Sequence, residues 1–128
     1  MKIEHIAFNV AAPVEVAAWY IENLGMKVVR SIGAPTFTHF LADETGTTII
    51  EIYNNPADQV PDYAAMNPLI FHLAFASENP ATDSRNLAKN GAIPVEELHL
   101  DDGSHLIMMR DPWGLAIQLC KRGVPLLK

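Results

Sequence analysis

The sequence predicts an α+β fold of two tandem βαβββ modules whose curved sheets form a cup. Three observations predict this fold. Apolar segments recur at a constant offset of 67 positions, two of them around a polar residue. A helical pattern bounded by proline and glycine follows the first segment of each half. Further short apolar segments, separated by turn residues, follow each helix.

The repeat is supported by three matches at the same offset. The first is centred on His5 and His72, and the last on Glu51 and Gln118. A single match could arise by chance, because apolar strands resemble each other, but three at one offset indicate an ancestral duplication. The matched segments are residues 3–10 with 70–77, Pro13 with Pro80, and residues 48–52 with 115–119.

The first half is expected to contain a strand, a helix and three further strands. Pro13 suits the first helical position, where its missing N–H is not needed, and Gly25 suits the position just after the helix. Val16, Tyr20 and Leu24 recur every four residues and predict one buried helical face. The expected elements are strands at residues 2–10, 27–32, 36–42 and 47–53 and a helix at residues 13–24.

The second half repeats this layout. Asn79 is the expected N-cap of its helix, Pro80 the first helical residue and Gly91 the residue after the helix. The turn Asp111-Pro112-Trp113-Gly114 precedes the last strand. The expected elements are strands at residues 69–77, 93–99, 104–110 and 115–121 and a helix at residues 80–90.

The whole chain, residues 1–128, is expected to form a single domain, because its length fits one compact core. Within it we expect module 1 at about residues 1–55 and module 2 at about residues 69–128. The stretch from about 54 to 68 contains three prolines and breaks any regular pattern, so we expect it to be the linker between the modules.

Composition excludes several classes of protein. The formal charge is −6 and no cluster of Lys and Arg occurs, which argues against nucleic acid or an anionic membrane as a partner. No apolar run approaches the roughly 20 residues that a membrane span needs. Cys120 is the only cysteine, so no intrachain disulfide can form. The first residues predict a strand rather than a signal peptide, and we therefore expect a cytoplasmic protein.

Four polar positions stand out in the apolar strands. Alternation along a strand places His5 on one face of the sheet and the bulky Ile6, Phe8 and Val10 on the other, where they suit packing against the helix. A carboxylate in the apolar run around Glu51 is costly unless it is paired, hydrogen-bonded or bound to metal. If the two modules pack about a pseudo-twofold axis, four side chains converge into an N/O site for a borderline divalent ion. These are His5, Glu51, His72 and Gln118.

This arrangement resembles the vicinal oxygen chelate superfamily, which includes glyoxalase I, extradiol dioxygenases, methylmalonyl-CoA epimerase and bleomycin-resistance proteins. The resemblance covers essentially the whole chain and implies a glyoxalase-like fold. The matching pieces are His5 in the first strand, Tyr20 with Leu24-Gly25-Met26 at the end of the first helix, Glu51 in the fourth strand, His72 at the start of the second module, and Asp111-Pro112-Trp113-Gly114 leading into Gln118.

The resemblance implies four metal ligands at His5, Glu51, His72 and Gln118, with Zn, Ni, Co, Mn or Fe as the divalent ion. In glyoxalase I-like members the last ligand is ordinarily a glutamate that also shuttles the substrate proton. Glutamine cannot accept a proton near neutral pH, so Glu51 is the expected catalytic carboxylate. An extradiol dioxygenase triad would be broken at the same position.

The implied function is a metal-dependent isomerase or lyase that acts on a small oxygenated metabolite by chelating two neighbouring oxygens. One alternative is a metal-free small-molecule binding protein of the bleomycin-resistance type. Another is a non-haem Fe(II) dioxygenase that uses both histidines and Glu51. A homodimer is expected, because small modules with incomplete sheets leave edges and apolar surface to cover. The site can form within one chain or between two.

The remaining candidate residues are expected to have structural or surface positions rather than roles in the site. His39, His99 and His105 have no histidine at the repeat-equivalent position, and we expect them at the surface or the rim of a pocket. Arg30 and Arg110 are expected to be solvated strand ends. Cys120 is expected to be a small buried apolar residue. A phosphate-binding loop, a dinucleotide-binding glycine set and a nucleophile elbow are all missing from the sequence.

Overall fold

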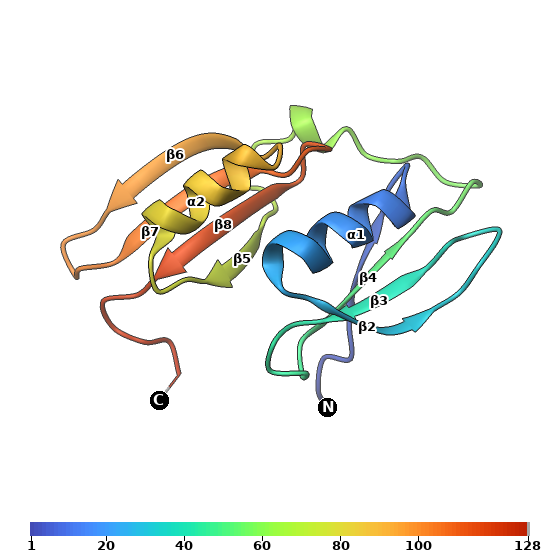
Figure 1. The fold of residues 1–128 in the computed structure, drawn as a ribbon, viewed down its shortest axis with the longest axis horizontal. Coiled ribbons are helices and arrows are strands. Elements are labelled where there is room, and N and C mark those ends of the chain that lie inside the picture. Colours follow the sequence, from blue (N-terminus) through green and yellow to red (C-terminus); the bar gives the residue numbers. More distant parts are fainter. Residues whose placement is uncertain (128) are drawn as a thin grey trace. The chain divides into compact units, whose positions relative to one another are not determined.

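The computed structural model describes residues 1–127, and over these residues the chain forms two compact units. The first unit spans Met1–Pro61 and the second begins at Asp62, inside the expected linker. Each unit contains one four-stranded mixed sheet and one α-helix (Figure 1). The fold class predicted from the sequence, α+β with two βαβββ modules, is confirmed. No helix among the described residues is long and apolar enough to cross a membrane.

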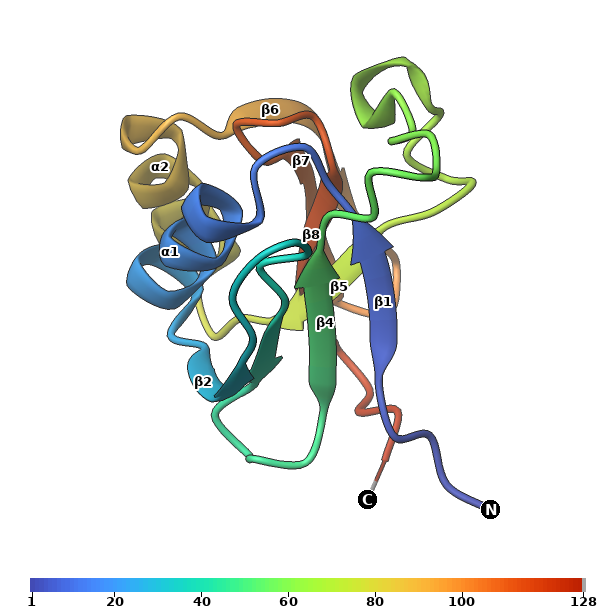
Figure 2. The ribbon, with the colours of Figure 1, turned by 90° about the vertical axis from the view of Figure 1, so that its right-hand side faces the viewer.

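The first unit has the strand order β1-β4-β3-β2. Strands β1 and β4 run parallel, side by side (Figure 2), and the other two pairs are antiparallel. Its elements are β1 (Ile6–Asn9), α1 (Pro13–Leu24), β2 (Lys27–Ser31), β3 (His39–Ala42) and β4 (Ile49–Tyr53). The β1 strand is shorter than predicted, so His5 lies immediately before its first residue.

The second unit repeats this topology in the order β5-β8-β7-β6, with β5 parallel to β8. A short 3-10 helix, η1 (Tyr63–Ala65), precedes the sheet. The other elements are β5 (Leu73–Ala76), α2 (Pro80–Lys89), β6 (Ile93–His99), β7 (His105–Arg110) and β8 (Ala116–Lys121). His72 lies immediately before β5, as His5 does before β1.

Each helix covers one face of its own sheet. In the first unit Tyr20 of α1 is fully buried, and alternate residues of β4, Ile50 and Ile52, are buried with it. Phe8 and Val10 are buried as the alternation predicted. Ile6 was expected in the same buried set, but 41% of its surface is exposed, because it stands at the first position of a short strand.

The helix ends follow the predicted chemistry. Pro13 and Pro80 occupy the first positions of α1 and α2. Gly25 adopts a left-handed conformation with φ of 67° just after α1, where a side chain would be strained. The Asn79 side chain accepts a hydrogen bond from the N–H of Thr82 and caps α2. These signals end each helix within one residue of its predicted boundary.

Arg110 anchors η1 to the sheet of the second unit. Its guanidinium donates hydrogen bonds to the carbonyls of Tyr63 at 2.9 Å, Met66 at 2.8 Å and Gly114 at 3.0 Å. Arg110 therefore connects two backbone segments through hydrogen bonds, and the expectation of a solvated strand end was wrong. The reason is tertiary, because the three carbonyls come from two segments that the sequence pattern does not bring together.

Asp111 organises the turn before β8. It is 2% exposed, and its Oδ1 accepts hydrogen bonds from the N–H groups of Trp113 and Leu115, both at 2.9 Å. Gly114 completes the turn with φ of 94°, and a Cβ there would lie 2.6 Å from the side chain of Ala64. The turn thus sets where β8 begins and hence which β8 residues face the helix.

Replacing Asp111 by alanine is expected to destabilise the protein by about 1–3 kcal/mol, because the buried N–H of Leu115 and the partly buried N–H of Trp113 lose their acceptor. Chemical denaturation measures this free energy of unfolding. Asp101→Ala, at an exposed turn position, is the control and should change it by less than about 0.5 kcal/mol. Equal effects of the two substitutions would contradict the role given to Asp111.

Candidate metal site

The first half of the predicted site lies in the first unit. Ile50 and Ile52 point toward α1, so the intervening Glu51 points to the opposite face of the sheet. Because Ala7 pairs with Glu51 across the parallel strands, the chain just before β1 brings His5 to the same place. His5 Nε2 lies 3.0 Å from Glu51 Oε2. The structure thus brings together the two predicted residues of this unit.

The surroundings of His5 hold its ring in one orientation. Phe40, which pairs with Glu51 across β3 and β4, meets the imidazole edge to face with ring centroids 5.7 Å apart. Nδ1 of His5 is buried without a hydrogen bond, and Glu4 Oε1 lies 3.4 Å from it. The side chains of His5 and Glu51 are 32% and 20% exposed, so both remain accessible to a ligand.

Gln118 takes the equivalent place in the second unit. It lies between Ile117 and Leu119, which are both buried, and its side chain points to the other face of the sheet. Its Oε1 accepts a hydrogen bond from Sγ of Cys120 at 3.1 Å. Burial raises the pKa of the Cys120 thiol, although Arg122 has a weaker opposite effect, so the thiol stays protonated as a donor. Cys120 is half-buried rather than the fully buried residue expected.

His72 carries its proton on a defined nitrogen. Its Nδ1 lies 2.8 Å from the carbonyl oxygen of Pro68, and a carbonyl can only accept. Nδ1 is therefore protonated in the neutral ring and Nε2 carries the lone pair. Metal-binding histidines commonly use one ring nitrogen as ligand and the other as donor to a carbonyl or carboxylate. In this arrangement, Nε2 of His72 is available as a ligand.

The residues predicted as metal ligands lie two in each unit. His5 and Glu51 supply an imidazole nitrogen and a carboxylate in the first unit, and His72 and Gln118 supply an imidazole nitrogen and an amide oxygen in the second. These N and O donor types suit Zn²⁺, Ni²⁺, Co²⁺, Mn²⁺ and Fe²⁺. Nδ1 of His5 lies beside Glu4 and Nδ1 of His72 contacts the Pro68 carbonyl, so Nε2 is the ring nitrogen of each that could bind an ion.

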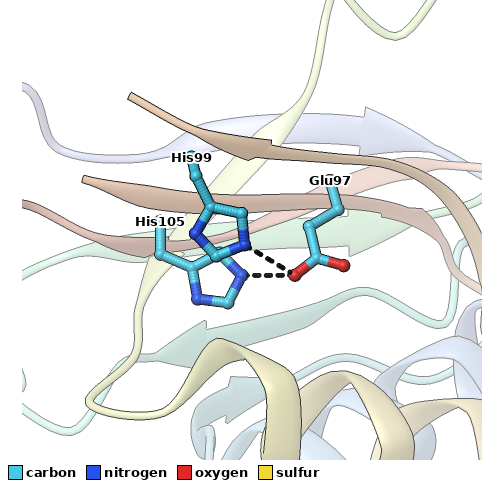
Figure 3. Close-up of side chains that lie close together, drawn as sticks. All are labelled: Glu97, His99 and His105. Carbon is cyan, nitrogen blue, oxygen red and sulfur yellow. Dashed lines mark hydrogen bonds and ion pairs between the residues drawn. The ribbon is translucent and has the colours of Figure 1, made fainter. Parts of the chain in front are cut away.

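A second cluster was missed by sequence reasoning. Glu97 and His99 of β6 and His105 of β7 lie together (Figure 3), with Glu97 Oε1 3.2 Å from His99 Nε2 and 2.7 Å from His105 Nε2. Their ligand atoms all lie within 4.8 Å of one another. His99 is at the surface as expected, His105 is partly buried, and both belong to one cluster. The signal that sequence reasoning missed is their symmetric position about the turn at residues 100–104, which pairs them across a hairpin.

Hydrogen bonds from the two histidines stabilise the charged form of Glu97. The bond from His105 has the larger effect and lowers the pKa of this carboxyl, while partial desolvation opposes it and His99 adds to it. Glu97 is therefore an ionised acceptor at neutral pH, and the two Nε2 atoms are its donors.

Comparisons with known proteins agree with this architecture. The family model described as Glyoxalase/Bleomycin resistance protein/Dioxygenase superfamily matches residues 2–119. A solved glyoxalase family protein from Enterococcus faecalis is 26% identical with a TM-score of 0.70, over 94% of this chain and 97% of that chain. No protein among the curated ones matches the sequence.

Two more distant solved structures share the fold. A glutamate-to-glutamine mutant of glyoxalase I from Zea mays is 22% identical with a TM-score of 0.74, over 94% of this chain and 45% of that chain. An antibiotic binding protein from Streptomyces is 14% identical with a TM-score of 0.73, over 95% of this chain and 96% of that chain. Enzymes and binding proteins thus both use this architecture.

His72 and His105 should show opposite imidazole tautomers in the metal-free protein. In the neutral form of each ring, His72 is expected to carry its proton on Nδ1 and His105 on Nε2. Long-range ¹H–¹⁵N spectra distinguish the tautomers, with His72→Gln and His105→Gln providing the assignments. Finding the Nε2–H form at His72 would show that its bond to Pro68 does not form in solution.

Proposed function

Because the chain belongs to the Glyoxalase/Bleomycin resistance protein/Dioxygenase superfamily, we propose that it is a metal-dependent isomerase or lyase acting on a small oxygenated metabolite. The observation that carries the proposal is the 3.0 Å contact between His5 Nε2 and Glu51 Oε2 on the uncovered face of their sheet. The repeat-equivalent His72 supports it, because its Nε2 is left as a ligand.

His5, Glu51, His72 and Gln118 would hold the ion. Two ligands bound to one tetrahedral ion at about 2.0–2.2 Å lie about 3.3 Å apart, so the 3.0 Å between His5 Nε2 and Glu51 Oε2 would need to widen only slightly. The space between these two atoms is therefore the position that we propose for the ion. Glu4 beside Nδ1 of His5 and the Pro68 carbonyl at His72 would then orient the two rings.

A divalent ion, when bound, polarises neighbouring substrate oxygens as a Lewis acid. The chain itself must then supply the group that moves the proton. Glu51 is the carboxylate of the proposed set, whereas the amide of Gln118 cannot accept a proton near neutral pH. We therefore assign proton transfer to Glu51, in addition to its role as ligand. Its partial exposure, 20%, allows a substrate to reach it.

We propose that the active form is a homodimer. Proteins of this superfamily bind small molecules and often form dimers. The first-unit residues His5 and Glu51 can meet His72 and Gln118 of the same chain or of a second chain. Both arrangements would use the same four residues, so they are separated by experiment below.

A metal-free binding protein is the second candidate. It is favoured by the hydrogen bond between the Cys120 thiol and Gln118 Oε1, which occupies the amide oxygen that would otherwise bind the ion. The similar antibiotic binding protein from Streptomyces shows that the fold serves such a role. A non-haem Fe(II) dioxygenase using His5, His72 and Glu51 is distinguished from both by a requirement for O₂.

His5→Gln and His72→Gln are each expected to weaken the same divalent-metal-binding event by at least about tenfold, because each removes one imidazole ligand of one site. Isothermal titration of the metal-free protein with Zn²⁺ measures the effect. The fold should persist, since neither side chain is in the buried core. His39→Gln, whose Nδ1 bonds the carbonyl of Phe37, is the matched control and should bind as wild type.

Mixing the two variants separates a shared site from an intrachain one. A dimer of one His5→Gln chain and one His72→Gln chain contains one intact site if the site is shared between chains, and none otherwise. Recovery of Zn²⁺ binding on mixing supports the shared arrangement. If wild type binds no transition metal at micromolar concentration, the enzyme proposal fails and the binding protein takes its place.

Gln118→Glu is expected to tighten Zn²⁺ binding by about tenfold or more, because it adds a ligand charge next to the ion. Gln59→Glu, an exposed position in the first unit, adds the same charge elsewhere and should have little effect.

Wild type should turn over the hemithioacetal of glutathione and methylglyoxal weakly, because Gln118 cannot serve as a general base and such a base typically contributes about 10²–10⁴-fold. Robust wild-type turnover would show that Glu51 alone suffices.

A further inference from the structure

A separate set of metal-ligating side chains lies on the opposite face of the second sheet from Gln118. Met108 pairs with Gln118 across β7 and β8, so their side chains share one face. His105 is three positions from Met108 and points to the other face. His99 pairs directly with His105, and Glu97 is two residues before His99, so all three share that face.

We propose that Glu97, His99 and His105 form a second binding site for a divalent ion of the Zn²⁺ class, independent of the site around His5. Two imidazoles and one carboxylate are a common donor set for Zn²⁺, and three protein ligands leave a fourth position for solvent. All three residues belong to the second unit, so the cluster is complete within one unit of one chain.

The distances are already close to those of a metal site. Glu97 Oε1 lies 3.2 Å from His99 Nε2 and 2.7 Å from His105 Nε2. Two atoms bound to one tetrahedral ion at about 2.0–2.2 Å are about 3.3 Å apart. The exposed side chain of Glu97 needs to move only slightly, and an ion between the three side chains (Figure 3) would bind Nε2 of each ring, with the imidazole proton on Nδ1.

Strand pairing between β6 and β7 sets the positions of the two histidines. They are directly opposite in an antiparallel ladder, and their rings stack with centroids 4.1 Å apart at 18°. The His105 side chain is 18% exposed, whereas those of His99 and Glu97 are 71% and 52% exposed. An ion therefore reaches the cluster freely and orders only two side chains when it binds.

Charge and position favour a cation here. The turn that joins the two histidines contains Asp101 and Asp102, and the chain carries a net charge of −6. Every residue of β6 is exposed, and β6 is an edge strand whose only partner in its sheet is β7. An ion held by residues of both strands would tie this edge to the sheet and thereby stabilise the folded unit.

The test uses Zn²⁺ as the probe and the full-length, metal-free protein. Isothermal titration with Zn²⁺ and thermal unfolding with and without Zn²⁺ are measured for wild type and for His105→Gln, His99→Gln and Glu97→Gln. The same three substitutions are repeated in a His5→Gln background, which removes the proposed catalytic site. His39→Gln is the control for loss of a strand histidine outside both sites.

The proposal expects each of the three substitutions to weaken one Zn²⁺-binding event at least about tenfold, and to remove the Zn²⁺-induced rise in Tm that persists in the His5→Gln background. Because His99 is largely exposed, His99→Gln keeps the test valid if His105→Gln unfolds. Unchanged Zn²⁺ affinity and Tm in His99→Gln and Glu97→Gln would overturn the second site. Unchanged binding in His5→Gln alone would overturn only the proposed function.

Discussion

Each sheet of this protein has one helix, and one helix covers only one face. This constraint decides on which face of each sheet the residues of the candidate site lie. The last strand of each unit must bury alternate residues beneath the helix, as Ile50 and Ile52 do in the first unit. Glu51 and its repeat-equivalent, Gln118, therefore fall on the face that the helix leaves uncovered. A carboxylate costs far less there than beneath the helix, and it can meet His5 at the end of a parallel strand.

The ligand geometry depends on groups outside the four predicted residues. The Pro68 carbonyl sets the tautomer of His72, and Glu4 lies beside the buried Nδ1 of His5. Both contacts involve Nδ1, so Nε2 is the nitrogen of each ring that could bind an ion. Outer contacts of this kind orient metal-binding imidazoles in general, so they belong to the site as much as the ligands do. In the cluster of Glu97, His99 and His105, strand pairing aligns the rings of the two histidines instead.

The fold was largely predictable from the sequence because its signals are local. Pro13 and Gly25 mark both ends of a helix, and period-two alternation separates Glu51 from its apolar neighbours. The pairing of His5 with Glu51 followed from the repeat. Three-dimensional consequences were not predictable in the same way. Arg110 binds carbonyls of a segment more than forty residues away, and no pattern in the chain encodes that contact. The cluster at Glu97 depended on hairpin register, which a search guided by the repeat passed over.

The central claim, that His5 and Glu51 bind a divalent ion, is tested most directly by anomalous scattering. Crystals grown with Zn²⁺ and measured on both sides of the zinc absorption edge locate the ion without any assumption about activity. The account predicts an anomalous peak about 2.0–2.2 Å from His5 Nε2 and from a carboxylate oxygen of Glu51, completed by His72 and Gln118. Crystals that contain Zn²⁺ but show no peak beside His5 would contradict it, even if a peak appears at the cluster of Glu97, His99 and His105.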